Sequence, residues 1–348
     1  MFLRGKVTVD PEQLTHIKVE KPEGSFRKLF YHITGGKVGD KKEIETLKAI
    51  SIIQQMHSTF ACMGIDNVIR INHDDIEIYF DTKGEKADLD FAMDKYSIEI
   101  DESMSKYFDS LWMVLEHEDE EFKYLIEISV NRNHKVNEYP IEIIVSGLLK
   151  EFGDLKGEQL KNKLNGVFKN QKRYDRYIND SKQKFDSFLN NLSFELQKRM
   201  RVDDVKIQST KRMIVQKEQA EKSREEAKPS SYAGTPYTYY GFGDFLLYSV
   251  LWSELCFDRN IHVSDAEIIN EEGHLFGEVG ESGMDAVEGS IFDKDVSIED
   301  LSASDGSTLL EGDSFLDTSD SGVFESAFES DGGGWFDSVS DGGFDFDF

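Results

Sequence analysis

The last quarter of the chain has a composition that cannot build an ordinary hydrophobic core. From Val263 to Phe348 there are 24 acidic residues and one base, Lys294, and the apolar side chains are separated by Gly, Ser and Asp. Burial of so few apolar groups cannot offset the conformational entropy that ordering would cost. The composition therefore predicts a disordered acidic tail over residues 263–348 and leaves the fold to residues 1–262.

Charge is unevenly distributed in the rest of the chain as well. Residues 1–262 carry 44 acidic and 39 basic side chains, but Lys156 to Lys217 contains 16 Lys and Arg against 7 Asp and Glu. A polyanionic tail repels nucleic acid and anionic membrane, and it is attracted to basic surfaces, including one on its own chain. The pattern predicts an intramolecular contact of the tail with this basic middle segment.

Residues 1–155 have the periodicities of an α+β domain. A capping box at Asp40 opens a helix whose apolar residues recur every three or four positions until Gly64, a stop signal. Two alternating runs, 67–71 and 75–81, predict a β-hairpin, and 97–116 predicts a strand followed by a short helix or a second strand. The runs FKYLIEISVN and EYPIEIIVSGLL predict two further strands because they are rich in Ile, Val and Tyr.

The pattern changes to helices in residues 156–217, which we expect to form a basic helical segment packed on that domain. Apolar residues from Phe185 to Met200 follow the period of an amphipathic helix, and a shorter helix is indicated around Leu164. The stretch 203–216 is compatible with one more strand. Residues 218–236 are nearly free of apolar side chains and end in Pro-Ser-Ser, which is typical of a linker or a solvated helix end.

An aromatic-rich stretch, residues 237–262, follows the linker and predicts a docking segment. As a helix, residues 245–257 expose more apolar surface than one short helix can hide, so they should pack on the folded domain, on a partner or on a membrane surface. The run is too short to span a bilayer, and the net charge of −28 argues against anionic lipid. The residues expected to make this contact are Phe245, Leu247, Leu251, Trp252 and Leu255.

No stretch of the sequence carries a catalytic or cofactor motif. HITGGKVGDKKE places glycines and lysines before a helix but lacks the spacing of a phosphate-binding P-loop. His57 and Cys62 have no second ligand pair, and the acidic run 116–121 lacks the pattern of a calcium loop, which favours a solvated turn. We therefore expect no cofactor and no metal, while an enzyme whose site cannot be recognised in one sequence stays an open alternative.

The basic middle segment contains a pattern that suits a polyanion. Cations can neutralise phosphates and aromatic rings can stack on unpaired bases, so KNQKRYDRY predicts a single-stranded nucleic-acid site or a site for the acidic tail. The alternative is a solvated helix face whose aromatic rings pack inward. The residues concerned are Lys169, Lys172, Arg173, Tyr174, Arg176 and Tyr177.

Aromatic residues recur in the tail within the imperfect repeats SDSGVFES, SDGGGWFDS and SDGGFDF. Aspartates keep such a segment extended and attract a basic pocket, while Phe and Trp supply the burial that anchors it. In form, the last ten or so residues resemble the acidic, Phe-ended tails of bacterial and phage single-stranded-DNA-binding proteins, although no OB-type pattern accompanies them. The predicted partner-binding residues are Phe324, Phe328, Trp335, Phe336, Phe344, Phe346 and Phe348.

Taken together, these patterns favour a non-enzymatic adaptor protein that binds a protein with a basic, apolar groove. The start of the chain lacks a signal-peptide core, and the two cysteines are far apart, so we expect a cytoplasmic location. The alternatives are a single-stranded nucleic-acid-binding protein with an autoinhibitory tail, a peripheral membrane protein attached through residues 245–257, and an enzyme. Fold class is expected to be an α+β domain with a basic helical second half, a linker and the tail.

Overall fold

The fold is taken from a computed structural model. The structure describes residues 1–9, 17–34, 41–74, 76–81, 110–131, 139–152, 155, 157–202, 205–214, 248–249, 251–252, 255–256, 258–269 and 275–279. The chain divides into two units, residues 1–303 and 304–348, and the described residues all belong to the first.

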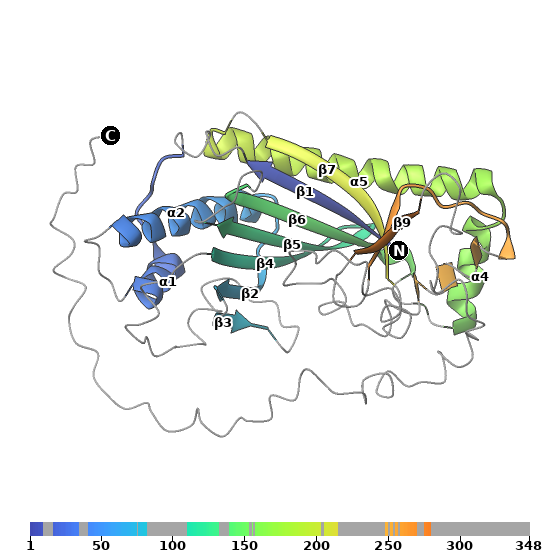
Figure 1. Ribbon diagram of the computed structural model, residues 1–348, viewed down its shortest axis with the longest axis horizontal. Coiled ribbons are helices and arrows are strands. Elements are labelled where there is room, and N and C mark those ends of the chain that lie inside the picture. The colour runs from blue at the N-terminus through green and yellow to red at the C-terminus, as the bar shows by residue number, and fades with distance from the viewer. Residues whose placement is uncertain are drawn as a thin grey trace, which may run out of the picture. The chain divides into compact units, whose positions relative to one another are not determined.

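A nine-stranded sheet forms the centre of this first unit, in the order β3-β2-β4-β5-β6-β1-β7-β8-β9 (Figure 1). Neighbouring strands are antiparallel except β7 and β8, which are parallel. The first strand of the chain therefore lies in the interior of the sheet, between β6 and β7. The strands are β1 (Phe2–Val9), β2 (Asn67–His73), β3 (Ile76–Phe80), β4 (Ser110–Glu118), β5 (Phe122–Asn131), β6 (Ile141–Leu149), β7 (Val205–Ile214), β8 (Ala266–Ile269) and β9 (Leu275–Val279).

Helices pack on one face of this sheet. The longest helix, α5 (Gln171–Met200), runs beside β1 and β7, and α2 (Lys41–Ala61) contacts β4, β5 and α5 (Figure 1). Asn170 begins α5 as an N-cap, because its side chain accepts a hydrogen bond of 3.0 Å from the backbone N–H of Arg173. The remaining helical elements are α1 (Gly24–Thr34), which packs on α2, the 3₁₀ turn η3 (Lys150–Phe152) and α4 (Gly157–Val167).

Two glycines let α5 approach the sheet closely. A Cβ atom on Gly147 of β6 would lie 2.8 and 2.9 Å from ring atoms of Phe185, and one on Gly5 of β1 would overlap the side chain of Leu189. The absent side chains thus provide the space into which two fully buried residues of α5 fit. Together with α2, these residues form the main hydrophobic core on the helix-covered face.

The mixed α+β character predicted from the sequence is confirmed, and so are the individual elements of the first half. The helix after Asp40 is α2, the hairpin is β2–β3, and the two Ile- and Val-rich runs are β5 and β6. For the end of residues 97–116 the sequence left a short helix and a second strand open. The strand is correct, because residues from Ser110 onward form β4.

One predicted boundary is wrong. The acidic tail cannot start at Val263, because Val263 is fully buried and β8 and β9 extend the sheet beyond β7. Four apolar side chains of this stretch are buried: Ile261, Val263, Ala266 and Ile268. Pairing with β7 at the edge of the sheet thus orders a short apolar pattern despite its acidic neighbours. The basic segment is helical only as far as Met200, and its end is strand β7, in agreement with the strand that the sequence indicated for residues 203–216. The predicted linker, residues 218–236, and the tail from residue 280 lie outside the described residues.

Candidate functional site

A polar pocket of about 550 Å³ lies between α5, β7 and the turn that precedes β8. We call it the polar pocket. Residues 174, 178 and 182 are spaced by four and so lie on one face of α5. Residues 209 and 211 are two positions apart and so lie on one face of β7. The ionisable and hydroxyl side chains that line it include Asp175, Lys182, Ser209, Lys211, His262 and Asp265.

The turn that closes the polar pocket is fixed by side-chain hydrogen bonds to its backbone. The amide of Gln171 donates to the carbonyl oxygen of His262 at 3.0 Å and accepts from the N–H of His262 at 2.8 Å. From the opposite side, the Nζ of Lys211 donates to the carbonyl oxygen of Ser264. The walls of the pocket are therefore held together by bonds between three separate elements, which keeps its shape defined.

The two lysines of the polar pocket differ in their partners. Lys182 lies 2.8 Å from a carboxylate oxygen of Asp186 and 2.8 Å from the hydroxyl of Ser209. Burial lowers the pKa of Lys211, the charge of Asp265 opposes this shift, and the smaller effects of Lys182 and Asp175 act in opposite directions. Such a cavity can hold a small polar molecule that accepts hydrogen bonds.

The four predicted cations lie at the start of α5 and just before it, where all four are exposed. We call Lys169, Lys172, Arg173 and Arg176 the basic surface. Arg173 donates a hydrogen bond to the carbonyl oxygen of Gly166, and none of the four has an ion pair within the part of the chain that the structure describes. This arrangement leaves a cluster of positive charge open to solvent.

The two predicted tyrosines of this segment do not share that surface. Tyr174 is only 3 % exposed, and Tyr177 is partly buried against the core. Their rings lie 6.1 Å from the ring of Trp252, so they pack inward. The expectation that these rings offer stacking faces to bases is wrong for this reason, and the alternative of an inward-packed helix face holds.

Residues of the predicted docking segment lie inside the folded body. Leu251 and Trp252 are fully buried, Leu255 is 2 % exposed, and the Trp252 ring meets Phe168 edge-on at 4.7 Å. The hydroxyl of the neighbouring Ser249 accepts a hydrogen bond of 3.1 Å from the amino group of Met1. Of the three docking surfaces considered, these residues use the folded domain, since their side chains are not exposed to a partner or membrane. Phe245 and Leu247 lie outside the described residues.

The opposite face of the sheet carries a buried ionisable group, Glu127, that sequence reasoning missed. Glu127 on β5 is 3 % exposed, and neither carboxylate oxygen has a hydrogen-bond partner within the described ranges. Burial raises its pKa to about 8, against the opposing charges of Arg4 and Arg70. Burial likewise lowers the pKa of Arg4 to about 9, with Arg212 acting in the same direction. The available signal was a single glutamate between apolar residues in the run LIEIS.

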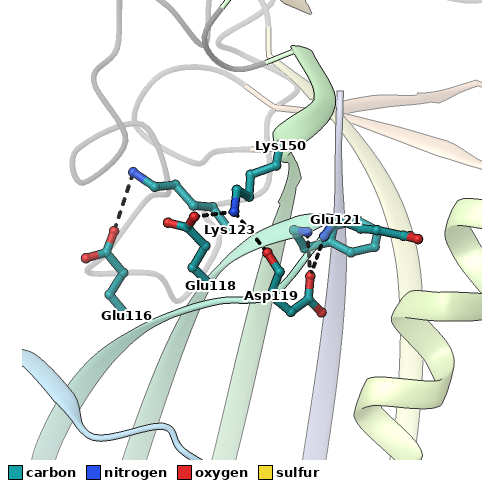
Figure 2. A network of polar contacts seen from close by, with 7 residues as sticks. Glu116, Glu118, Asp119, Glu121, Lys123 and Lys150 are labelled. Atoms are coloured by element: carbon teal, nitrogen blue, oxygen red, sulfur yellow. Dashed lines mark hydrogen bonds and ion pairs between the residues drawn. The ribbon is translucent and has the colours of Figure 1, made fainter.

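The acidic run 116–121 covers the end of β4 and the turn into β5, and lysines of the same chain pair with three of its glutamates (Figure 2). The carboxylate of Asp119 accepts hydrogen bonds from the backbone N–H groups of Glu121 and Phe122, both at 2.7 Å, and from the Tyr124 hydroxyl at 2.9 Å. Lys150 pairs with Glu118 and donates to the Asp119 carbonyl oxygen at 3.0 Å, as Figure 2 shows. The carboxylate of Asp119 thus closes the β4–β5 hairpin, while three glutamates of the run pair with lysines: Glu116 with Lys123, Glu118 with Lys150 and Glu121 with Lys184.

Within the described part of the chain, no group of three or more His, Cys, Asp or Glu residues is placed to hold a metal ion. None of the described helices is long and apolar enough to cross a membrane. The predicted partner-binding aromatics from Phe324 to Phe348 lie outside the described residues. Comparison with family models, with curated proteins and with solved structures finds no match to this chain.

Proposed function

We propose that this chain is a non-enzymatic adaptor protein whose acidic C-terminal segment binds a basic, apolar groove on a partner protein. One contrast carries the proposal. Residues 304–348 contain 12 acidic residues, no Lys or Arg, and recurrent Phe and Trp. In the described body, by comparison, Tyr31 and Phe194 are the only large hydrophobic side chains that are exposed. The tail is therefore the part of the sequence that combines recurrent aromatic residues with a high density of acidic residues.

Acidic and aromatic residues would contribute to different steps of such binding. Aspartates raise the rate of encounter with a basic surface, and this contribution weakens with salt. Aromatic side chains that enter pockets supply most of the binding free energy, and their loss raises the dissociation rate. A cytoplasmic location suits the two cysteines, which are free thiols, one exposed and one buried.

The test replaces either the aromatics or the charges at the end of the tail. Partners are captured from a lysate on the full chain, identified by mass spectrometry, and then titrated as purified proteins. Substitution of Phe344, Phe346 and Phe348 with Ala should weaken the purified interaction at least about tenfold, because hot-spot aromatics each contribute more than about 1 kcal/mol. The matched variant with Asn at positions 341, 345 and 347 should mainly slow association. Unchanged affinity in the Ala variant, with loss in the Asn variant, contradicts the adaptor proposal and leaves a purely electrostatic tail.

A second candidate function, polyanion binding, is favoured by the exposure of the basic surface. Because Tyr174 and Tyr177 are packed inward, this binding would use phosphate or carboxylate charge and would not read unpaired bases by stacking. The acidic tail would compete for the same cations within one chain, at a high effective concentration. This interpretation keeps the nucleic-acid alternative but changes its chemistry from base recognition to charge recognition.

Fluorescence anisotropy with a labelled thymidine oligonucleotide tests this candidate. The chain that ends at residue 303 should bind more tightly than the full chain, and the logarithm of its affinity should fall linearly with that of the salt concentration. Substitution of Lys169, Lys172 and Arg176 with Gln should reduce that slope. Lys198→Gln is the matched control, because Lys198 is exposed on the same helix but pairs with Glu195. Equal affinities of the two chain lengths would remove autoinhibition, and an unchanged slope would remove the basic surface.

A further inference from the structure

The charged side chains that line the polar pocket do not pair with one another. Lys182 of α5 and Lys211 of β7 supply two cations to its lining. Asp175 of α5 and Asp265, which directly precedes β8, supply two carboxylates. Among the described residues neither of these carboxylates forms an ion pair, and the counter-ion of Lys182 is Asp186, which does not line the pocket. Charges of both signs are therefore held around one cavity without neutralising each other.

Hydrogen-bond donors remain available on the two lysines and on the serine beside them. The ammonium group of Lys182 has three N–H donors and uses two of them, on Asp186 and on the Ser209 hydroxyl, each at 2.8 Å. Because Ser209 Oγ accepts that bond, its own O–H can donate to another group. Lys211 lies two positions further on the same face of β7, and its ammonium group donates one hydrogen bond, to the carbonyl oxygen of Ser264. These three side chains can therefore donate together to one carboxylate group.

Hydrogen-bond acceptors line the same cavity. One oxygen of Asp175 accepts from the side-chain amide of Gln171 at 2.7 Å, which fixes this carboxylate on the surface of α5. Asp265 is exposed and stands in the turn that closes the pocket. A carboxylate has about four acceptor positions, so both aspartates can accept from an ammonium group. Ile178 also lines the pocket and offers an apolar contact to the carbon atoms of a bound molecule.

We propose that the polar pocket binds a free amino acid. The carboxylate of the ligand accepts hydrogen bonds from Lys182, Lys211 and Ser209, and its ammonium group donates to the two aspartates. A purely anionic ligand would be repelled by the aspartates and a purely cationic one by the lysines, whereas a zwitterion is attracted by both pairs. The volume of about 550 Å³ is in the range of small-molecule sites. This assignment goes beyond the proposed adaptor and polyanion functions and depends on neither.

Saturation-transfer difference NMR tests the proposal on the full chain at neutral pH. Each standard amino acid is added separately at about 10 mM, which detects dissociation constants in the millimolar range. At least one amino acid should bind, and its titration into the isotopically labelled chain should shift the amide signals of residues 209–211 and 262–265. Propionate and propylamine each carry one of the two charges. Both should bind at least about tenfold more weakly, because each lacks one set of charge-assisted hydrogen bonds.

Variants of both charge types show whether the ligand uses both sides of the site. Lys211→Gln and Asp265→Asn should each weaken binding of the same amino acid at least about tenfold. Lys198→Gln and Asp180→Asn are the matched controls and should leave the affinity unchanged, because both residues are exposed on α5 and neither lines the pocket.

Three outcomes overturn the proposal. The first is that no amino acid binds, or that the shifted amide signals lie outside the pocket, and this result on the wild-type chain does not depend on the folding of any variant. The second is that propionate binds as tightly as the amino acid, which would make the pocket a general anion site. The third is that Lys211→Gln or Asp265→Asn keeps the wild-type affinity.

Discussion

On the face of the sheet that α5 covers, Gly5 and Gly147 lie against the side chains of Leu189 and Phe185. On the opposite face, Arg4 places a guanidinium group in desolvated surroundings. Successive residues of a strand point to opposite faces, so neighbours in the sequence experience these two environments. The helix-covered face is filled by apolar side chains that form one continuous core. The other face has a smaller apolar cluster of Ile69, Val114 and Leu125 and, paired with Val114 across β4 and β5, the buried carboxyl group of Glu127.

The comparison teaches that the two faces should respond to different perturbations. A close-packed apolar face loses stability when volume is removed or added, at any pH. A face with buried ionisable groups depends on their protonation states, because a buried charge without a hydrogen bond is costly. On the face with Glu127 and Arg4, stability should therefore depend on pH. On the face with Phe185 and Gly147, stability should depend on changes in side-chain volume.

The largest effect is expected from Phe185→Ala on the helix-covered face. Phe185 is fully buried and its ring contacts the rings of Phe122 and Tyr124, so truncation leaves a cavity and should lower the free energy of unfolding by about 3–5 kcal/mol. Urea denaturation measures this change. Phe194→Ala is the matched control on the same helix, because Phe194 is 57 % exposed and its loss should alter stability by less than about 0.5 kcal/mol. Equal losses in the two variants would contradict the assignment of the buried face.

Local periodicity explains how much of this fold could be predicted. The apolar spacing of α5 identified Phe185, Leu189 and Leu192 as core residues, and the alternation in β5 and β6 identified both strands. Strands β8 and β9 could not be found in the same way, because a four-residue strand in acidic sequence is ordered by pairing with β7, a partner distant along the chain. The polar pocket was missed for the same reason, since Lys182, Lys211 and Asp265 come together only through that pairing.

Charge patterns gave a correct account of exposure but not of aromatic orientation. Lys169, Lys172 and Arg176 were predicted to be a solvent-facing cluster and are exposed, while Tyr174 and Tyr177 were ambiguous. Their inward packing depends on Trp252, which joins the core from a segment far along the sequence. Buried Glu127 was similarly hidden, because its neighbours Arg4 and Arg70 reach it from other strands.

An intermediate effect is expected when volume is added to the helix-covered face. Gly147→Ala places a methyl group 2.8 Å from the ring of Phe185 and 3.2 Å from that of Phe122, and overpacking of this kind should cost about 1–3 kcal/mol of unfolding free energy. Gly166→Ala in α4 is the matched control, since its new methyl group meets nothing within 4 Å beyond its chain neighbours and its own helix backbone, and it should stabilise by about 0.5–1 kcal/mol. Combining Gly147→Ala with Phe185→Leu should cost less than the sum of the two single changes, because the smaller side chain makes room. Strict additivity would show that the glycine is not required by the close approach of α5.

Glu127→Gln, on the opposite face, should have the smallest effect on the free energy of unfolding at acidic pH. Above that range, the variant should change how this free energy depends on pH. The folded protein raises the pKa of Glu127 from 4.5 to about 8, so the folded state binds one proton more than the unfolded state between these values. Its contribution to stability is therefore complete below pH 4.5 and is lost as the pH rises through about 8. Near pH 5, where the carboxyl is protonated, Gln is a close isostere and the free energy of unfolding should change by less than about 1 kcal/mol. Between about pH 5.5 and pH 7.5 the wild-type free energy should fall relative to that of the variant, by at most about 1.4 kcal/mol per pH unit. Arg4 stays charged throughout this range, because its pKa of about 9 lies above it.

Glu142→Gln controls for the removal of an acidic group from the same face, since Glu142 is paired with Lys6 at 2.6 Å, and that variant should retain the wild-type pH slope. If the slopes of wild type and Glu127→Gln coincide, the carboxyl of Glu127 is ionised in the folded state, and the difference between the two faces of the sheet lies in packing alone.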